Sequence, residues 1–299
     1  MCLAVPMPRD AVEGVGEPAA PEGPATAGSR RREVAADSAR SLLLTVLGEF
    51  VHPRRAPVWT AVLVEALGLV GVEEKSARQA LARTAGEGLL EPSRHGRRAQ
   101  WSLTMAGTGL LTEGTRRIYG FMRVATPWDG RWLVLTVAIP ETQRKLRHRL
   151  RTRLTWAGLG SPVPGLWVVP DAGKEAEVAA VISDLGVAEH AYAWVGSTAP
   201  FADERRLVSE AWSLADVEGR YCDFIARFSA VTPADPADAF AWQVRLIQEW
   251  RRFPFLDPAL PPALLDHEWA GRRAADLFHR LHDDWHEAAQ EHWESLTPR

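Results

Sequence analysis

The chain has 299 residues, of which 46% are hydrophobic, and a formal net charge of −3 at pH 7. This length predicts two or three domains with sizeable cores, and it excludes a small disulfide-stabilised protein because the only cysteines are Cys2 and Cys222. No apolar run reaches the roughly 18 residues of a membrane span, and the N-terminus lacks a secretion signal, so we expect a cytoplasmic protein without membrane contact.

The charges are distributed unevenly along the chain. Residues 38–123 carry 12 Lys and Arg against 7 Asp and Glu, whereas residues 201–299 carry 11 against 18. A basic N-terminal segment and an acidic C-terminal segment indicate a polyanionic partner for the N-terminal one. Surface charge also varies along a chain without any function. Residues 1–37 are rich in Pro, Gly and Ala and are predicted to be a disordered tail.

Three helices are predicted at the start of the next segment, residues 38–114. Ser38 or Asp37 can cap the first, residues 39–51, Pro57 suits the first turn of the second, residues 57–70, and the third begins near Glu73. The third helix carries Ala77, Ala80, Leu81 and Ala85 inward. Beyond Gly88 we expect a hairpin, residues 89–91 against 100–103, with residues 92–99 as its connection.

Helices followed by a hairpin with a basic tip are the element order of a winged helix-turn-helix. Such a fold places the polar face of its third helix in the major groove, where Arg and Gln read base edges, while the hairpin meets phosphates. The alternative is a helical domain with a solvated basic hairpin. The candidate DNA-binding residues are Lys75, Ser76, Arg78, Gln79 and Arg83 on the helix and Arg94, Arg97 and Arg98 on the hairpin.

Residues 115–200 are predicted to hold a linker and a ferredoxin-like domain. Apolar runs at residues 132–139, 165–170 and 190–196 alternate with helical patterns at 141–160 and 173–186, which gives a β-α-β-α-β order. Basic residues line its first helix and indicate either a phosphate-binding surface or a solvated face. They are Arg144, Lys145, Arg147, Arg149, Arg151 and Arg153.

Residues 201–299 are predicted to form a helical domain. Asp235 and Pro236 are an N-cap and first-turn pair for a helix that follows, and a last helix is expected from about 270 to 295. Tryptophans are dense here, and they either fill the core or line a pocket for a flat ligand. The tryptophans are Trp212, Trp242, Trp250, Trp269, Trp285 and Trp293.

No catalytic constellation or cofactor motif is found. The spacing of His279, His282, Asp283 and His286 suits zinc or iron, but a polar helix face gives the same pattern, and we assign no metal there. An acidic residue at a strand end, Asp129, suggests the alternative of a metal-dependent nuclease built on the middle domain. Asp129 lies in a Trp-Asp-Gly sequence, however, where Asp is an ordinary turn former.

Several strings, which together span about residues 38–280, resemble the PaaX-type repressors of bacterial phenylacetate catabolism. Three short motifs, RIY, W-D-G-x-W and L-x-W-x-G-x-G, occur in the same order and at similar spacing as in that family. The matching strings are SLLLTVLGEFV, SARQALARTAGEGLLEPSRHGRRAQWSLT, RRIYG, WDGRWLVLTVAIPETQRKLRHRLRTRLTWAGLG, PGLWVVP and WRRFPFLDPALPPALLDHEWAG.

The resemblance implies a non-enzymatic α+β protein. Its parts would be an N-terminal winged helix, a ferredoxin-like middle domain similar to a CRISPR-associated endonuclease, and a helical C-terminal domain. It further implies a homodimer that binds operator DNA and leaves it when an aryl-acyl-CoA such as phenylacetyl-CoA binds. The candidate DNA-binding residues fall where the family contacts DNA. The N-terminal tail and the histidine-rich end depart from the family pattern.

Overall fold

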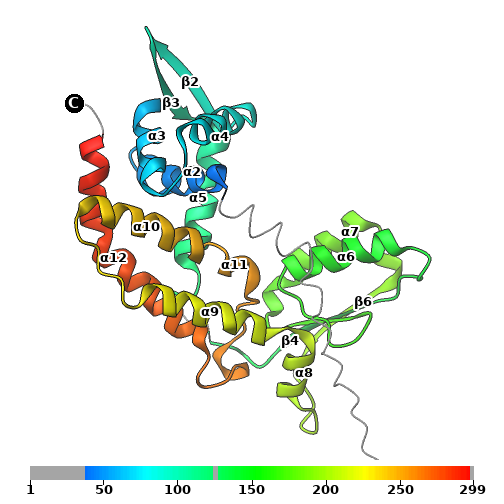
Figure 1. The fold of residues 1–299 in the computed structure, drawn as a ribbon. Coiled ribbons are helices and arrows are strands. Elements are labelled where there is room, and N and C mark those ends of the chain that lie inside the picture. The colour runs from blue at the N-terminus through cyan, green and yellow to red at the C-terminus, as the bar shows by residue number, and fades with distance from the viewer. Residues whose placement is uncertain (1–37, 124–126, 297–299) are drawn as a thin grey trace, which may run out of the picture. The chain divides into compact units, whose positions relative to one another are not determined.

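The computed structural model describes residues 38–123 and 127–296 (Figure 1). The predicted tail, residues 1–37, lies outside the described residues. The first segment, residues 38–114, begins with helix α2, which ends in a π-helical turn, η1. Its elements, with the helix that leaves it, are α2 (Ala39–Val46), η1 (Leu47–Val51), β1 (Val58–Trp59), α3 (Thr60–Leu69), α4 (Glu74–Gly86), β2 (Leu90–His95), β3 (Arg98–Leu103) and α5 (Met105–Gly120).

The start of α2 follows the sequence pattern. The Ser38 hydroxyl accepts a hydrogen bond from the backbone N–H of Ser41 at 3.2 Å, which satisfies one of the free donors of the first turn. The apolar face that follows is buried in the core, as its helical spacing predicts. Its residues are Leu42, Leu43, Val46, Leu47 and Phe50.

The second helix begins at Thr60, so the prediction that Pro57 starts it was wrong. Val58 and Trp59 form the short strand β1, which pairs with Trp101 and Gln100 of β3. The Thr60 hydroxyl then donates to the backbone carbonyl of Ala99 at 3.0 Å. The helix begins late because the residues before it gain backbone partners in the sheet.

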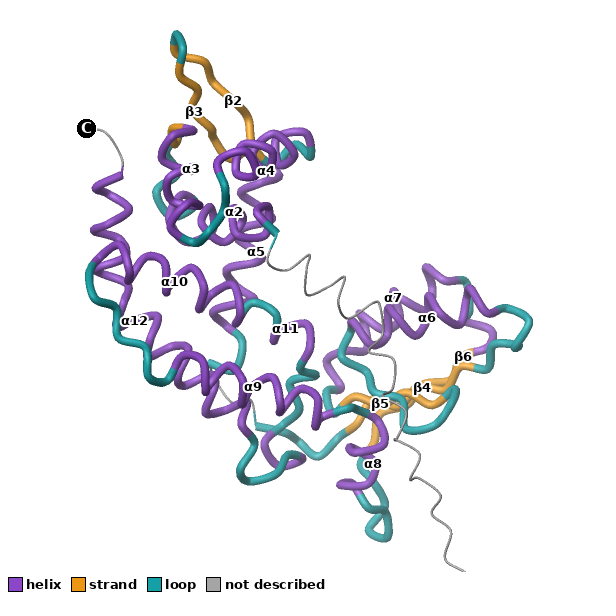
Figure 2. The backbone as a smooth tube through the Cα atoms, in the orientation of Figure 1, coloured by secondary structure: helices purple, strands orange, loops and turns teal. Residues whose placement is uncertain are grey.

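The hairpin is longer than predicted and its connection is shorter. β2 and β3 pair from Leu90↔Leu103 to His95↔Arg98, which leaves only Gly96 and Arg97 in the turn (Figure 2). Gly96 has φ of 60°, a conformation that glycine adopts without steric cost at the first position of a tight hairpin turn. The basic residues therefore lie on paired strands as well as at the turn.

Helix α5 was not predicted, and it runs through residue 114, where the first segment was expected to end. The Thr104 hydroxyl caps this helix by accepting from the N–H of Gly107 at 3.0 Å. Gly107 lies against the preceding hairpin, because a Cβ there would be 2.1 Å from the carbonyl oxygen of Leu89. Only glycine permits this approach of helix and strand.

The middle segment, residues 115–200, has the predicted β-α-β-α-β order. Its strands form an antiparallel sheet in the order β5-β4-β6, and Gly160 adds an isolated bridge to Val168 on β5. Its elements after α5 are β4 (Trp132–Val137), α6 (Arg144–Trp156), β5 (Leu166–Val169), η2 (Ala172–Lys174), α7 (Glu175–Leu185), η3 (Ala188–His190) and β6 (Ala191–Gly196).

Both faces of strand β4 are covered, which explains its continuous apolar sequence. Leu133, Leu135 and Val137 share a core with α6 and α7. Trp132 points to the opposite face, where it joins a small core with Val208 and Leu264 of the last segment.

The last segment is helical as predicted over its described residues, 201–296. The Asp235 side chain caps α10 by accepting from the N–H of Asp238 at 2.8 Å, with Pro236 in the first turn. Trp250, Trp269, Trp285 and Trp293 are buried, which favours the core over a ligand pocket. The elements are α8 (Glu204–Ala211), α9 (Leu214–Phe228), α10 (Pro236–Trp250), α11 (Phe253–Leu256), η4 (Pro262–Leu264) and α12 (Ala270–Leu296).

The first and last segments share one hydrophobic core. Phe240 of α10 and Trp293 of α12 belong to the same buried cluster as helices α2, α3 and α4. The ring of Phe50 lies 4.7 Å from that of Phe240 and 5.4 Å from that of Trp293. Within the described residues, no helix is both long enough and apolar enough to cross a membrane.

This shared core predicts the effect of truncating Trp293. Trp293→Ala is expected to lower the free energy of unfolding by about 3–5 kcal/mol, because it leaves a cavity between the two segments. Trp156→Ala is the matched control, since that indole is 75% exposed and its loss is expected to change stability by no more than about 0.5 kcal/mol. Urea unfolding followed by circular dichroism measures both, and equal effects would contradict the shared core.

Candidate nucleic-acid interface

Helix α4 has one buried and one exposed face, as its sequence predicts. Ala77, Ala80 and Leu81 are buried as predicted, Ala85 is half-buried against the same core, and Thr84 is buried as well. The Thr84 hydroxyl donates to the Ala80 carbonyl at 2.8 Å, so its burial leaves that hydroxyl satisfied. On the outer face, Ser76 is half-buried and the other candidates are exposed. The exposed candidates are Lys75, Arg78, Gln79 and Arg83.

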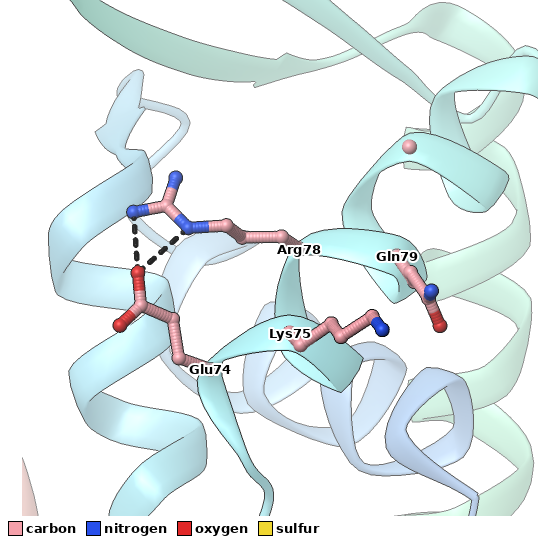
Figure 3. A pocket seen from close by; sticks show the side chains of 5 residues that line it. Glu74, Lys75, Arg78 and Gln79 are labelled. Atoms are coloured by element: carbon pink, nitrogen blue, oxygen red, sulfur yellow. Dashed lines mark hydrogen bonds and ion pairs between the residues drawn. The ribbon is translucent and has the colours of Figure 1, made fainter.

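The exposed face of α4 includes an acidic residue that the sequence analysis missed. Glu74, Lys75, Arg78, Gln79 and Ala82 line a shallow hollow (Figure 3). Glu74 accepts from Arg78 at 2.8 Å, whereas the polar ends of Lys75 and Gln79 extend away from that pair. A Glu four residues before an Arg on a helix is the signal that predicts this pair, and an exposed pair contributes only about 0.3–0.5 kcal/mol.

The arginines of the hairpin surround its tip. Arg94 lies opposite Ala99 and Arg98 lies opposite His95, so the alternation of side chains along a strand places Arg94 and Arg98 on opposite faces. Arg97 occupies the turn between them. The Arg98 face also holds His95, whose ring meets the edge of Trp59 with centroids 5.7 Å apart.

Most candidate cations on α4, the hairpin and α6 have no acidic partner. Within residues 38–123 and 127–296, no acidic side chain lies within 4.0 Å of Lys75, Arg83 or the three hairpin arginines. Arg78 on α4 is paired with Glu74, and on α6 Arg147 lies 3.7 Å from Glu141 and Arg153 lies 2.7 Å from Asp184. Ion pairing therefore does not distinguish the two surfaces as phosphate-binding candidates.

Asp129, the residue of the nuclease alternative, is engaged in a turn. Its carboxylate accepts from the backbone N–H of Arg131 at 2.9 Å and from the Arg131 guanidinium at 2.7 Å. The pKa of Asp129 is lowered below its usual value, mainly by the hydrogen bond from the Arg131 side chain. Both carboxylate oxygens thus have a local partner, which is the ordinary role of Asp in a turn.

The histidine-rich face of α12 meets the carboxylate of Glu49, a residue that no sequence motif singles out. His282 Nε2 lies 3.0 Å from Glu49 Oε1, and His286 Nδ1 lies 3.6 Å from the same oxygen. The other two residues of the pattern do not join them, since Asp283 is exposed and His279 Nε2 is buried without a hydrogen-bond partner. The sequence feature that could have pointed to Glu49 is a carboxylate in an otherwise apolar stretch, residues 47–51.

The surroundings of Glu49 keep it ionised. Burial raises its pKa, but hydrogen bonding and charge from His282, with hydrogen bonds from Tyr119 and Gln243, hold the pKa below its usual range. Burial likewise opposes the protonation of His282, and the Glu49 carboxylate reverses this and raises the His282 pKa. The result is a buried polar cluster between η1 and α12.

Three sequence models of one family match most of the chain. They are described as PaaX-like protein, which matches residues 38–107; PaaX protein central Cas2-like domain, residues 125–208; and PaaX-like protein C-terminal domain, residues 212–295. Among similar proteins, the transcriptional repressor PaaX of Escherichia coli (strain K12) is 32% identical over 251 residues. The match covers 80% of this chain and 78% of that protein.

A solved structure has a similar fold. It is the uncharacterized protein Rv0674 from Mycobacterium tuberculosis, which is 21% identical and superposes with a TM-score of 0.60 over 86% of this chain and 99% of its own. At this identity the likeness shows the fold alone. The predicted resemblance is confirmed by the three sequence models and by the repressor relative, and the chain belongs to the PaaX family.

Proposed function

We propose that this protein is a DNA-binding transcriptional repressor in which α2, α3 and α4 with the β2–β3 hairpin form a winged helix-turn-helix. The observation that carries the proposal is the exposed polar face of α4 beside a hairpin with arginines around its tip, both built on one core. The repressor relative supports the same function. None of the described residues supports the nuclease alternative over this one.

Helix α4 is the candidate for reading bases. In the major groove, Arg and Lys bind the acceptors of guanine and Gln pairs with adenine, and the N-terminal half of a recognition helix makes these contacts. Lys75, Arg78 and Gln79 lie in that half and are exposed, and Arg83 is exposed one turn after Gln79 on the same face. To contact DNA, Arg78 would have to break its ion pair with Glu74. This costs little free energy because the pair is exposed to solvent.

The hairpin is the candidate wing. A minor groove is bounded by two phosphate backbones, so a strand pair that enters it needs cations on both faces. Arg94 and Arg98 provide them, with Arg97 at the turn. These contacts would hold the protein on DNA without reading its sequence.

The middle segment is the candidate dimer contact. Its strand order, with Gly160 in place of a second strand, agrees with a ferredoxin-like split β-α-β unit. Strand β6 exposes Tyr192 and Trp194 on one face, an apolar surface that a second copy can cover. A homodimer would present two α4 helices about 34 Å apart to a palindromic operator.

The effector of the proposed repressor is an aryl-acyl-CoA such as phenylacetyl-CoA. We therefore expect the protein to shift its own upstream DNA in a gel, and phenylacetyl-CoA to release that DNA, because the effector favours a conformation with lower DNA affinity. Free coenzyme A is the control. DNA that stays bound with the ester would refute this effector, and no shift at low salt would refute the repressor itself.

The wing predicts a salt effect. Arg97→Ala with Arg98→Ala is expected to weaken operator and random DNA about equally and to lower the slope of log affinity against log salt by about 0.9 for each phosphate that is no longer bound. The matched control removes the same charge from α6, with Arg144→Ala and Arg149→Ala. Fluorescence anisotropy over a salt series measures the slopes. An unchanged slope in the wing variant would contradict the proposed phosphate binding.

Helix α4 predicts a specificity effect. Gln79→Ala or Arg83→Ala is expected to weaken operator binding by about 1–3 kcal/mol while leaving random DNA nearly unchanged, because each side chain is proposed to bind a base rather than a phosphate. Competition between operator variants shows at which base the preference relaxes. Equal weakening on operator and random DNA would reassign these residues to the phosphate backbone.

A further inference from the structure

We propose that Glu49, His282 and His286 bind one divalent transition-metal ion of the zinc class. Their three ligand atoms, Oε1 of Glu49, Nε2 of His282 and Nδ1 of His286, all lie within 4.8 Å of one another. Among the described residues, no other group of three or more histidine, cysteine or acidic side chains brings its ligand atoms this close together. The inference stands independently of the proposed DNA binding.

The distances suit a tetrahedral ion. Bonds of about 2.0–2.1 Å from a central zinc place neighbouring ligand atoms roughly 3.3–3.4 Å apart. The carboxylate oxygen of Glu49 lies 3.0 Å from the His282 nitrogen and 3.6 Å from the His286 nitrogen, on either side of that value. Shifts of a few tenths of an ångström would bring both pairs to the spacing that an ion requires.

The ligands come from elements that can hold them in place. His282 and His286 are four residues apart on α12, so both rings face the same side, with centroids 5.6 Å apart. Two histidines at this spacing with a glutamate from another element form a recurrent zinc-binding set. Glu49 supplies that third ligand from η1, which lies 233 residues away in sequence from His282.

A second layer of side chains orients these ligands. The Tyr119 hydroxyl donates to Glu49 Oε2, and Gln243 Nε2 donates to Glu49 Oε1 at 2.7 Å. Asp283 Oδ1 lies 3.5 Å from His282 Nδ1, so the other ring nitrogen, Nε2, is the one directed at Glu49. Hydrogen-bonded carboxylates and carboxylate-oriented histidines are the usual outer partners of metal ligands.

The site has a buried and an open side. The side chains of Glu49 and His282 are 7% and 16% exposed, whereas that of His286 is 50% exposed. An ion can therefore enter past His286, and the fourth position of the tetrahedron is left for water or another exchangeable ligand. The inner side keeps the carboxylate away from solvent, which strengthens its attraction for a cation.

A proton shared by His282 and Glu49 would also explain their 3.0 Å contact, so the test must separate a proton from a metal. An ion pair with the same carboxylate would likewise explain the 3.6 Å contact of His286, so only the stoichiometric binding of a metal distinguishes the two. Full-length chain without a histidine tag is first stripped with a chelator and then dialysed against Zn²⁺ or Co²⁺. We expect one ion per chain, intense visible absorption bands of tetrahedral Co²⁺, and a higher melting temperature with Zn²⁺.

His286→Ala is the informative variant because the side chain is half-exposed and its removal spares the core. We expect this variant to lose the Co²⁺ bands and at least about tenfold in Zn²⁺ affinity while its circular dichroism is unchanged. His148→Ala, on an exposed face of α6, is the control and is expected to bind like the wild type. Absence of stoichiometric binding by the wild type, or equal binding by both variants, would overturn the proposal.

Discussion

The contact that the rest of the structure depends on is the aromatic cluster of Phe50, Phe240 and Trp293. It joins the end of the first helix to α10 and α12, since Phe240 and Trp293 follow Phe50 by 190 and 243 residues. Helix α4 and the hairpin pack on the same core. The candidate interface and the C-terminal helices therefore form one packed body, because close-packed cores transmit displacement instead of absorbing it.

Buried polar contacts fix how these helices meet. Gln248 accepts from the Thr45 hydroxyl at 2.7 Å and donates to the Ser41 hydroxyl at 2.8 Å, which links α10 to α2. Arg251 donates to the Ser41 carbonyl at 3.2 Å. Apolar packing tolerates sliding, but a displaced helix would leave these groups unsatisfied at a cost of about 1–3 kcal/mol each. The network thus selects one register among the many that the apolar faces permit.

The parts of the structure that can be predicted from the sequence are those set by the spacing of apolar residues and by the residues at the ends of each element. The faces of α4, the capped start of α10 and the apolar strand β4 follow from spacing and from the residues at their ends. Helix α5 does not, because Gly107 lowers helix propensity and is required only by the strand packed against it. Glu49 is likewise ordinary in sequence, since its partners lie on distant elements and no periodicity joins them.

The shared core also limits how an effector could release DNA from the proposed repressor. Moving α2 and η1, on whose core α4 packs, relative to α10 or α12 would break the aromatic cluster and several buried hydrogen bonds at once, which costs more than the few kcal/mol of a typical coupling free energy. A ligand can shift an equilibrium only by its differential affinity for two states. The lower-energy route leaves this body intact and changes the separation of two such bodies in the proposed dimer, which would remove one α4 from register with its proposed half-site.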